Sequence, residues 1–170
     1  PHASNDNYIQ IIMSLTKIIR GAFVSRQKEI ERYDKEAEAL QMEVLHYLMS
    51  NAKHTEYGRK YSFGAVGSYS DYASHVPVNT YEELKGYIDR MRHGECDLLW
   101  KGSVKWYAKS SGTTNDKSKF IPVSHDGLQH VHYAGGKDAV ALYLRNNPDS
   151  RLFDGKSLIL GGSHSPNYGV

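Results

Sequence analysis

The stretch from Trp106 to Val123, which reads WYAKSSGTTNDKSKFIPV, constrains this chain more than any other. Two short runs that favour strands, Trp106 to Ala108 and Phe120 to Val123, flank residues that are almost all Ser, Thr, Gly, Asn, Asp or Lys. Gly112 has no Cβ, so the backbone there can turn sharply and approach a ligand closely. The order strand, loop, strand therefore predicts a polar loop that is held at both ends.

This loop carries the kinds of donor that a polyanion needs. Hydroxyl and ammonium groups come from Ser110, Ser111, Thr113, Thr114, Lys109, Lys117 and Lys119. Together with backbone N–H groups in a concave turn, such donors can replace the water around phosphates. A Walker A loop is excluded, because G-x-x-x-x-G-K-[ST] requires glycine at position 117 and because a strand follows the loop instead of a helix. A solvated turn is the alternative interpretation.

Two sequence blocks resemble a known family. Ser110-Ser111-Gly112-Thr113-Thr114, followed by Lys119 and Pro122, resembles the first signature of the adenylate-forming superfamily. A second block, VPVNTYEELKGYIDRMRHGE at Val76 to Glu95, stands a short way upstream. In this order and at this separation, the blocks resemble the auxin-responsive (Gretchen Hagen) acyl acid amido synthetases, over about Thr55 to Val123.

The resemblance implies an ATP- and Mg²⁺-dependent ligase, which activates a small carboxylic acid as an acyl-adenylate and then joins it to an amine or amino acid. It implies that the β- and γ-phosphates of ATP are held by Ser110, Ser111, Gly112, Thr113, Thr114 and Lys119. His164 and Asn167 are expected to approach the acyl substrate. Asn115 and Asp116 depart from relatives that carry a small residue and glycine, and Asp116 adds a negative charge. The later family signatures have no match, so the catalytic residues are not identified and we expect no turnover by these 170 residues alone.

Hydrophobic periodicity predicts helices at Tyr8 to Val24 and at about Arg26 to Ser50, which we assign to a helical segment over residues 1–52. Residues 53–170 are expected to form the N-terminal, incomplete part of an adenylate-forming α/β domain. The elements predicted there are loops and short helical turns over Lys53 to Ser74, a helix over Tyr81 to His93 with a Thr80–Glu83 capping box and Gly94 at its end, the two strands, a helix from the N-cap Ser124 to about Arg145, and a strand over Ser157 to Leu160. The fold class is therefore α/β, with N-terminal helices and part of a layered sheet domain. Because such a sheet would have open edges, we expect an N-terminal part of a larger protein.

Composition excludes several functions. Lys and Arg number 21 against 19 Asp and Glu, and this balance gives no reason to expect nucleic acid or a membrane as a partner. The only cysteine, Cys96, fits a reducing compartment, so we expect a cytoplasmic protein. No metal site is expected, because His125, His130 and His132 do not share one helical face. A hydrolase is disfavoured because the G-x-S-x-G elbow is absent.

The competing functional hypothesis is a non-catalytic module that binds a small acid or a protein through its tyrosine-rich surface.

Overall fold

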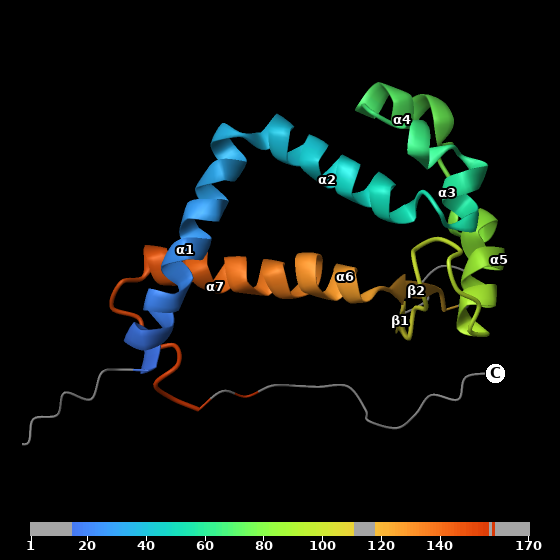
Figure 1. The fold of residues 1–170 in the computed structure, drawn as a ribbon. Helices are drawn as coiled ribbons and strands as arrows, with labels where there is room; N and C mark the ends of the chain where they lie inside the picture. Colours follow the sequence, from blue (N-terminus) through green and yellow to red (C-terminus); the bar gives the residue numbers. More distant parts are fainter. Residues whose placement is uncertain (1–14, 111–117, 157, 159–170) are drawn as a thin grey trace, which may run out of the picture.

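The computed structural model describes residues 15–110, 118–156 and 158. In chain order its elements are α1 (Leu15–Lys35), α2 (Ala37–Ala52), α3 (Glu56–Lys60), η1 (Phe63–Ala65), α4 (Tyr69–His75), α5 (Tyr81–Arg92), β1 (Trp106–Lys109), β2 (Phe120–Val123), α6 (His125–Gly127), η2 (Leu128–Tyr133) and α7 (Ala134–Asn146). Figure 1 shows α1 crossing α7 at one end of the molecule and α5 beside the β1–β2 hairpin at the other end.

The break between the two N-terminal helices lies at Glu36, where φ is −128° and ψ is 25°. Periodicity predicts this break near Ser25, and the prediction is wrong, because α1 continues through Ser25 to Lys35. The cause is tertiary. Arg26 pairs with Asp138 of α7 and also donates to the Tyr33 hydroxyl at 2.9 Å, which holds the second half of α1 in helical form against α7. Residues 8–14 of the predicted first helix lie outside the described residues.

The packing of α1 across α7 joins the two ends of the described chain. Ala141 and Leu144 of α7 are completely buried there. The guanidinium of Arg20 donates to the carbonyl of Leu144 at 2.5 Å, which satisfies one of the carbonyl groups that a helix C-terminus leaves without a partner. After α7 the chain returns to α1, where the N–H and hydroxyl of buried Thr16 donate to Asp154 Oδ1 at 3.0 and 2.9 Å.

The first core lies at the end of α2 and contains buried Met49, Ala52, Phe63 and Val66. Tyr57, Tyr61 and Tyr72 pack against it from the segment predicted to form loops and short helical turns, which contains α3, η1 and α4. These rings therefore cover a hydrophobic core.

The second core lies between α5 and β1 and contains Met91, Leu98 and Val104, with Leu98 only 1% exposed. The helix α5 begins as predicted, because the Thr80 N–H donates to Glu83 Oε2 at 2.6 Å in a capping box. It ends before Gly94, whose φ of +94° requires a residue that tolerates the left-handed region. The pKa of Glu83 is held below its usual range by these hydrogen bonds from the backbone and side chain of Thr80.

The hairpin pairs β1 and β2 antiparallel, with Trp106 opposite Val123 and Lys109 opposite Phe120. A long helix follows at once, because the Ser124 hydroxyl accepts from the Gly127 N–H at 3.0 Å and caps it as predicted. This helix runs from His125 to Asn146 through α6, η2 and α7, and η2 is a π-helical turn.

The N-terminal helices and the beginning of a sheet agree with the predicted fold class, and within the described residues the sheet has two strands. The predicted strand over Ser157 to Leu160 lies outside the described residues except for Leu158. The division of the chain into residues 1–52 and 53–170 stays a prediction.

Candidate functional site

Two of the predicted phosphate-binding residues, Ser110 and Lys119, are described, and they close the predicted loop at its base. The Ser110 N–H donates to the Lys119 carbonyl at 2.9 Å, and the Lys119 N–H donates to Ser110 Oγ at 3.0 Å. These bonds continue the β1–β2 ladder by one more residue on each strand. The Lys119 side chain is exposed, so its ammonium group can meet a ligand from solvent.

The helix α5 holds the other side of this base. The Phe120 N–H donates to the Tyr81 hydroxyl at 3.0 Å, and the Lys119 ammonium lies 5.3 Å from the centroid of the Tyr81 ring. At the far end of the helix, the Arg92 guanidinium carbon lies 3.8 Å from the centre of the Phe120 ring. The upstream sequence block is therefore in direct contact with Lys119 and Phe120, at the point where the predicted loop meets β2.

Four of the predicted phosphate-binding residues lie outside the described residues, namely Ser111, Gly112, Thr113 and Thr114. The same holds for His164 and Asn167, which are predicted to approach the acyl substrate. The assignment of all six therefore stays a prediction. The structure brings Ser110 and Lys119 together, as expected for the two ends of one loop.

Sequence reasoning missed the contacts of Tyr81 and Arg92 with the hairpin. The sequence predicts the helix over Tyr81 to His93 but gives no contact between that helix and the strands. The hydrogen bond between Tyr81 and Phe120 joins residues 39 positions apart, so local patterns cannot show it. The available signal was the order of the two blocks, with an aromatic residue directly after the Thr80 cap.

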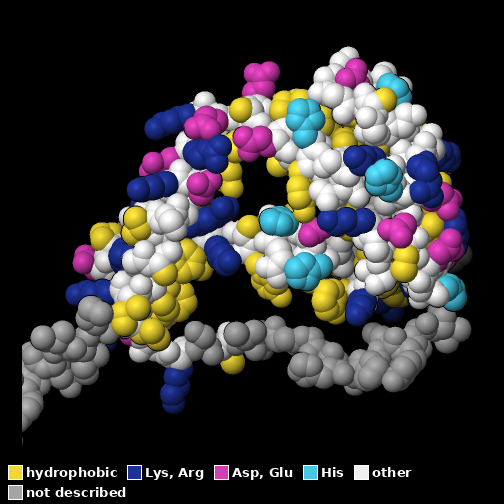
Figure 2. Space-filling model, viewed as in Figure 1, with side chains coloured by type: hydrophobic (Ala, Val, Ile, Leu, Met, Phe, Trp, Pro, Cys, Tyr) yellow, Lys and Arg dark blue, Asp and Glu magenta, His cyan; other side chains and the backbone are white. Residues whose placement is uncertain are grey.

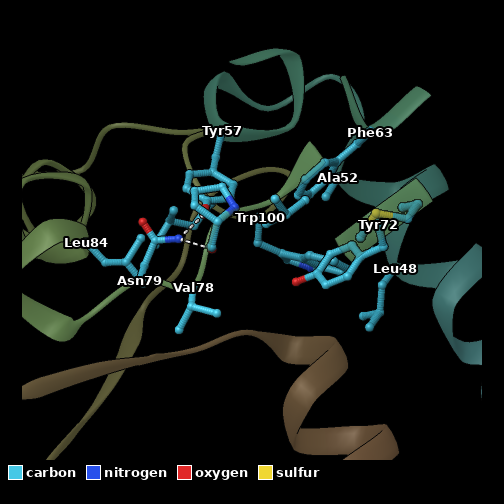
Figure 3. A pocket seen from close by; sticks show the side chains of 13 residues that line it. Leu48, Ala52, Tyr57, Phe63, Tyr72, Val78, Asn79, Leu84 and Trp100 are labelled. Carbon is cyan, nitrogen blue, oxygen red and sulfur yellow. Dashed lines mark hydrogen bonds between the residues drawn. The ribbon is translucent and has the colours of Figure 1, made fainter. Parts of the chain in front are cut away.

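An apolar cavity of about 480 Å³ lies where the chain enters α5. Figure 3 shows Tyr57, Asn79 and Trp100 around it, with Phe63 and Tyr72 on the side of the first core. The Asn79 side-chain amide donates to the Tyr57 hydroxyl at 2.8 Å and to the Pro77 carbonyl at 2.6 Å. Burial raises the pKa of Tyr57, so this phenol stays neutral over an even wider pH range than an exposed one.

A larger cavity of about 790 Å³ opens between α2 and the helix that follows β2, and Figure 2 shows the opening. Tyr47, Trp100, His130 and Val131 line it, and the Trp100 indole N–H donates to Asp126 Oδ2 at 3.1 Å. Neither Ser110 nor Lys119 lines either cavity, so the predicted phosphate loop and these apolar spaces are separate features.

Within residues 15–110, 118–156 and 158, no group of three or more His, Cys, Asp or Glu side chains could hold a metal ion. No helix in these ranges combines the length and the apolar character that crossing a bilayer requires.

Comparisons with known proteins agree on one family. The chain is 34% identical to the indole-3-acetic acid-amido synthetase GH3.15 of Arabidopsis thaliana over 121 residues, which are 71% of this chain and 20% of that protein. It is 27% identical to the jasmonoyl–L-amino acid synthetase JAR4 of Nicotiana attenuata over 103 residues, which are 60% of this chain and 18% of that protein.

The solved structure of the GH3.15 acyl acid amido synthetase is similar to this fold, with a TM-score of 0.64 at 26% identity. The match covers 75% of this chain and 22% of that one, and it confirms the expected fold class. The chain spans about a fifth of the length of the curated relatives that it matches. The family model described as the GH3 family N-terminal domain matches residues 26–167, and the chain therefore belongs to the GH3 family.

Proposed function

We propose that this chain contributes the phosphate-binding part of an ATP-dependent ligase, which activates a carboxylic acid as an acyl-adenylate and then forms an amide with an amine or amino acid. The names of the relatives support this proposal, because they are synthetases that join indole-3-acetic acid or jasmonate in amide linkage. The proposal concerns the protein that contains the complete ligase machinery. For residues 1–170 alone we expect no turnover.

The proposed reaction has two steps. A carboxylate is a poor electrophile and must first be activated. Its oxygen attacks the α-phosphorus of ATP, the bond between this phosphorus and the oxygen bridging to the β-phosphorus breaks, and pyrophosphate leaves. The amine then attacks the acyl carbon, releases AMP and loses a proton to form the amide. In the first step negative charge grows on the leaving pyrophosphate, and preorganised donors aimed at that charge lower the barrier.

The observation that carries the proposal is the closed loop base, where Ser110 and Lys119 meet. The Ser110 Oγ accepts from the Lys119 N–H, and a hydroxyl that accepts one bond still has its own proton to donate. Lys119 belongs to the same loop base and is exposed, so its ammonium can contact the leaving pyrophosphate. We assign the remaining donors to Ser111, Thr113 and Thr114, with Gly112 allowing close backbone approach.

The described donors also suit a magnesium complex of the nucleotide. Magnesium is usually bound through one or two protein oxygens and the phosphates of its substrate, so it needs no cage of protein ligands. Hydroxyl oxygen such as Ser110 Oγ is a hard ligand of the kind that Mg²⁺ accepts. When bound, the ion would neutralise charge on the β- and γ-phosphates.

The second part of the proposal concerns the acyl substrate, the division of the chain and the compartment. We assign His164 and Asn167 to the approach of the acyl substrate, since loops at strand ends of α/β sheets line ligand crevices. We also keep the division at residue 52, with a helical segment before it and the α/β domain after it. The exposed thiol of Cys96 supports a reducing compartment, and we propose the cytoplasm.

The test is exchange of labelled pyrophosphate into ATP by the complete protein, with a panel of carboxylic acids. We expect exchange that depends on one class of acid. Lys119→Ala should lower this exchange about a hundredfold, the usual cost of removing one transition-state contact of about 3 kcal/mol. Lys105→Ala is the matched control, because Lys105 is also an exposed lysine and directly precedes β1, and we expect wild-type exchange from it.

The competing binding module would be favoured if the complete protein showed no pyrophosphate exchange with any acid of the panel, yet bound one of these acids in calorimetry. The structure gives that alternative little support, since Tyr57, Tyr61 and Tyr72 pack against the first core. Exchange that survives Lys119→Ala unchanged would remove the assignment of that lysine and leave the ligase proposal standing.

A further inference from the structure

The peptide group between Lys119 and Phe120 is fixed on both of its sides. Its carbonyl accepts from the Ser110 N–H at 2.9 Å, and its N–H donates to the Tyr81 hydroxyl at 3.0 Å. A peptide group is planar, so two bonds on opposite edges define its orientation. That orientation sets the direction in which the Lys119 side chain leaves the backbone. Tyr81 thus controls the residue that we assign to the phosphates, although it belongs to another element.

The Tyr81 ring restricts the same lysine a second time. Its centroid lies 5.3 Å from the Lys119 ammonium, within the range where a ring face attracts a cation. A free lysine side chain samples many rotamers, and an anion that binds it must select one of them. A ring beside the ammonium reduces the number of rotamers that the side chain samples before the anion binds. The three N–H donors of the ammonium leave it able to bind an anion while one side faces the ring.

The position of Tyr81 is itself well determined. Tyr81 is the first residue of α5, directly after Thr80, whose N–H and hydroxyl donate to Glu83 Oε2 at 2.6 and 2.8 Å. Arg92 follows 11 residues later and therefore lies about three helical turns along on the same face of the helix. Because Arg92 stacks on the Phe120 ring, this one face of α5 holds Phe120 by its backbone and by its side chain.

We propose that Tyr81 is a positioning residue for nucleotide binding, which orients Lys119 through the Phe120 N–H and through its ring. The inference rests on the proposed function, because it needs Lys119 to contact the phosphates. It goes beyond that function by giving the upstream block a defined part in the reaction. Tyr81 does not touch the substrate itself.

Two substitutions separate its two contacts. Tyr81→Phe keeps the ring and removes the hydroxyl that accepts from Phe120, whereas Tyr81→Leu removes both. The matched control is Tyr69, which is the first residue of α4 after the N-cap Ser68 and is 71% exposed. Tyr69→Phe and Tyr69→Leu place the same changes at the same helical position away from the hairpin.

In the complete protein we expect Tyr81→Phe to lower kcat/KM for ATP in pyrophosphate exchange about tenfold, the cost of losing one hydrogen bond to a partly buried donor. Tyr81→Leu should cost more, and both Tyr69 variants should match wild type. In a Lys119→Ala background the Tyr81→Phe change should lower kcat/KM by less than about twofold, because the effects of substitutions at residues that act through one another do not add. Amide hydrogen exchange at Phe120 should also become faster in Tyr81→Phe, without any ATP present.

The outcomes distinguish the two proposals. If wild type exchanges pyrophosphate and Tyr81→Phe does so equally well, the positioning role is wrong while the ligase proposal stands. Equal losses from Tyr81→Phe with and without Lys119 would also overturn it, because they would show that Tyr81 acts independently of the lysine. If wild type neither binds ATP nor exchanges pyrophosphate, the proposed function fails and takes the positioning role with it.

Discussion

Leu98 is the residue at which the second core depends most on a single side chain. It is 1% exposed and packs with Met91 of α5 and with Val104, just before β1. Its carbonyl accepts from the Tyr57 N–H at 3.0 Å, which satisfies one of the free amides at the start of α3. Leu98→Ala leaves this backbone bond in place, so the change reports the side chain alone.

The expected loss in free energy of unfolding follows from the three carbons removed. At about 0.8 kcal/mol for each buried CH₂ the transfer contribution is about 2.4 kcal/mol, and the residual cavity raises the total to about 3 kcal/mol. With a urea m-value of about 2 kcal/mol per molar, the unfolding midpoint should fall by about 1.5 M. Tryptophan fluorescence measures it directly, because Trp100 and Trp106 are the only two tryptophans and lie close to Leu98 in sequence.

The control for Leu98→Ala is Leu152→Ala, because Leu152 is 45% exposed and should change stability by less than about 0.5 kcal/mol. A Leu98→Ala variant that unfolds within that same range, at an unchanged m-value, would refute the reasoning. It would mean that the space left by the side chain refills, and that the second core does not hold α5 to the hairpin.

Two further predictions concern glycine and charge. Gly58→Ala should destabilise the protein by about 2 kcal/mol or more, because a Cβ there would lie 2.0 Å from the Ala52 carbonyl oxygen. Gly86→Ala should stabilise α5 by about 0.5–1 kcal/mol, because a Cβ there meets open space. Thermal melts measure both changes. Hydrogen bonds from Arg90 hold the pKa values of Glu56 and Glu95 below their ordinary value of 4.5, so their stabilisation is complete above pH 4.5 and is lost as the pH falls through the lowered values. Arg90→Gln should therefore lower the urea midpoint at pH 7, and the difference from wild type should disappear as the pH falls below the lowered pKa values. A difference in midpoint that stays constant from pH 7 into acid would contradict the pairing of Arg90 with Glu56 and Glu95.

Local signals in the sequence predicted the elements whose ends are decided locally. Thr80 and Glu83 begin α5 through bonds within one turn, and Ser124 caps the long helix in the same way. The strand over Phe120 to Val123 is also where the sequence puts it. The end of α1 is different, because the pair between Arg26 and Asp138 spans 112 residues and overrides the weak local preference for a break near Ser25.

In the candidate site, too, local contacts could be predicted from the sequence and long-range contacts could not. Ser110 and Lys119 were predictable because one short loop brings its two ends together. The part played by Tyr81 was not, because a tyrosine at the start of an amphipathic helix is usually a packing residue. Only the folded arrangement shows that its hydroxyl accepts from Phe120 instead of facing water.

The length of α5 gives a physical reason why the two sequence blocks work together. Arg92 lies 11 positions after Tyr81, which is about 16 Å along the helix axis and about three whole turns. Both residues contact Phe120, one at its backbone N–H and one at its ring, so Phe120 must lie between the two ends of the helix. Only long side chains on one face can meet there. A helix with one residue more or fewer between them would rotate Arg92 by about 100° and take it off this face. The upstream block is therefore best understood as a support of fixed length for the strand that begins beside Lys119.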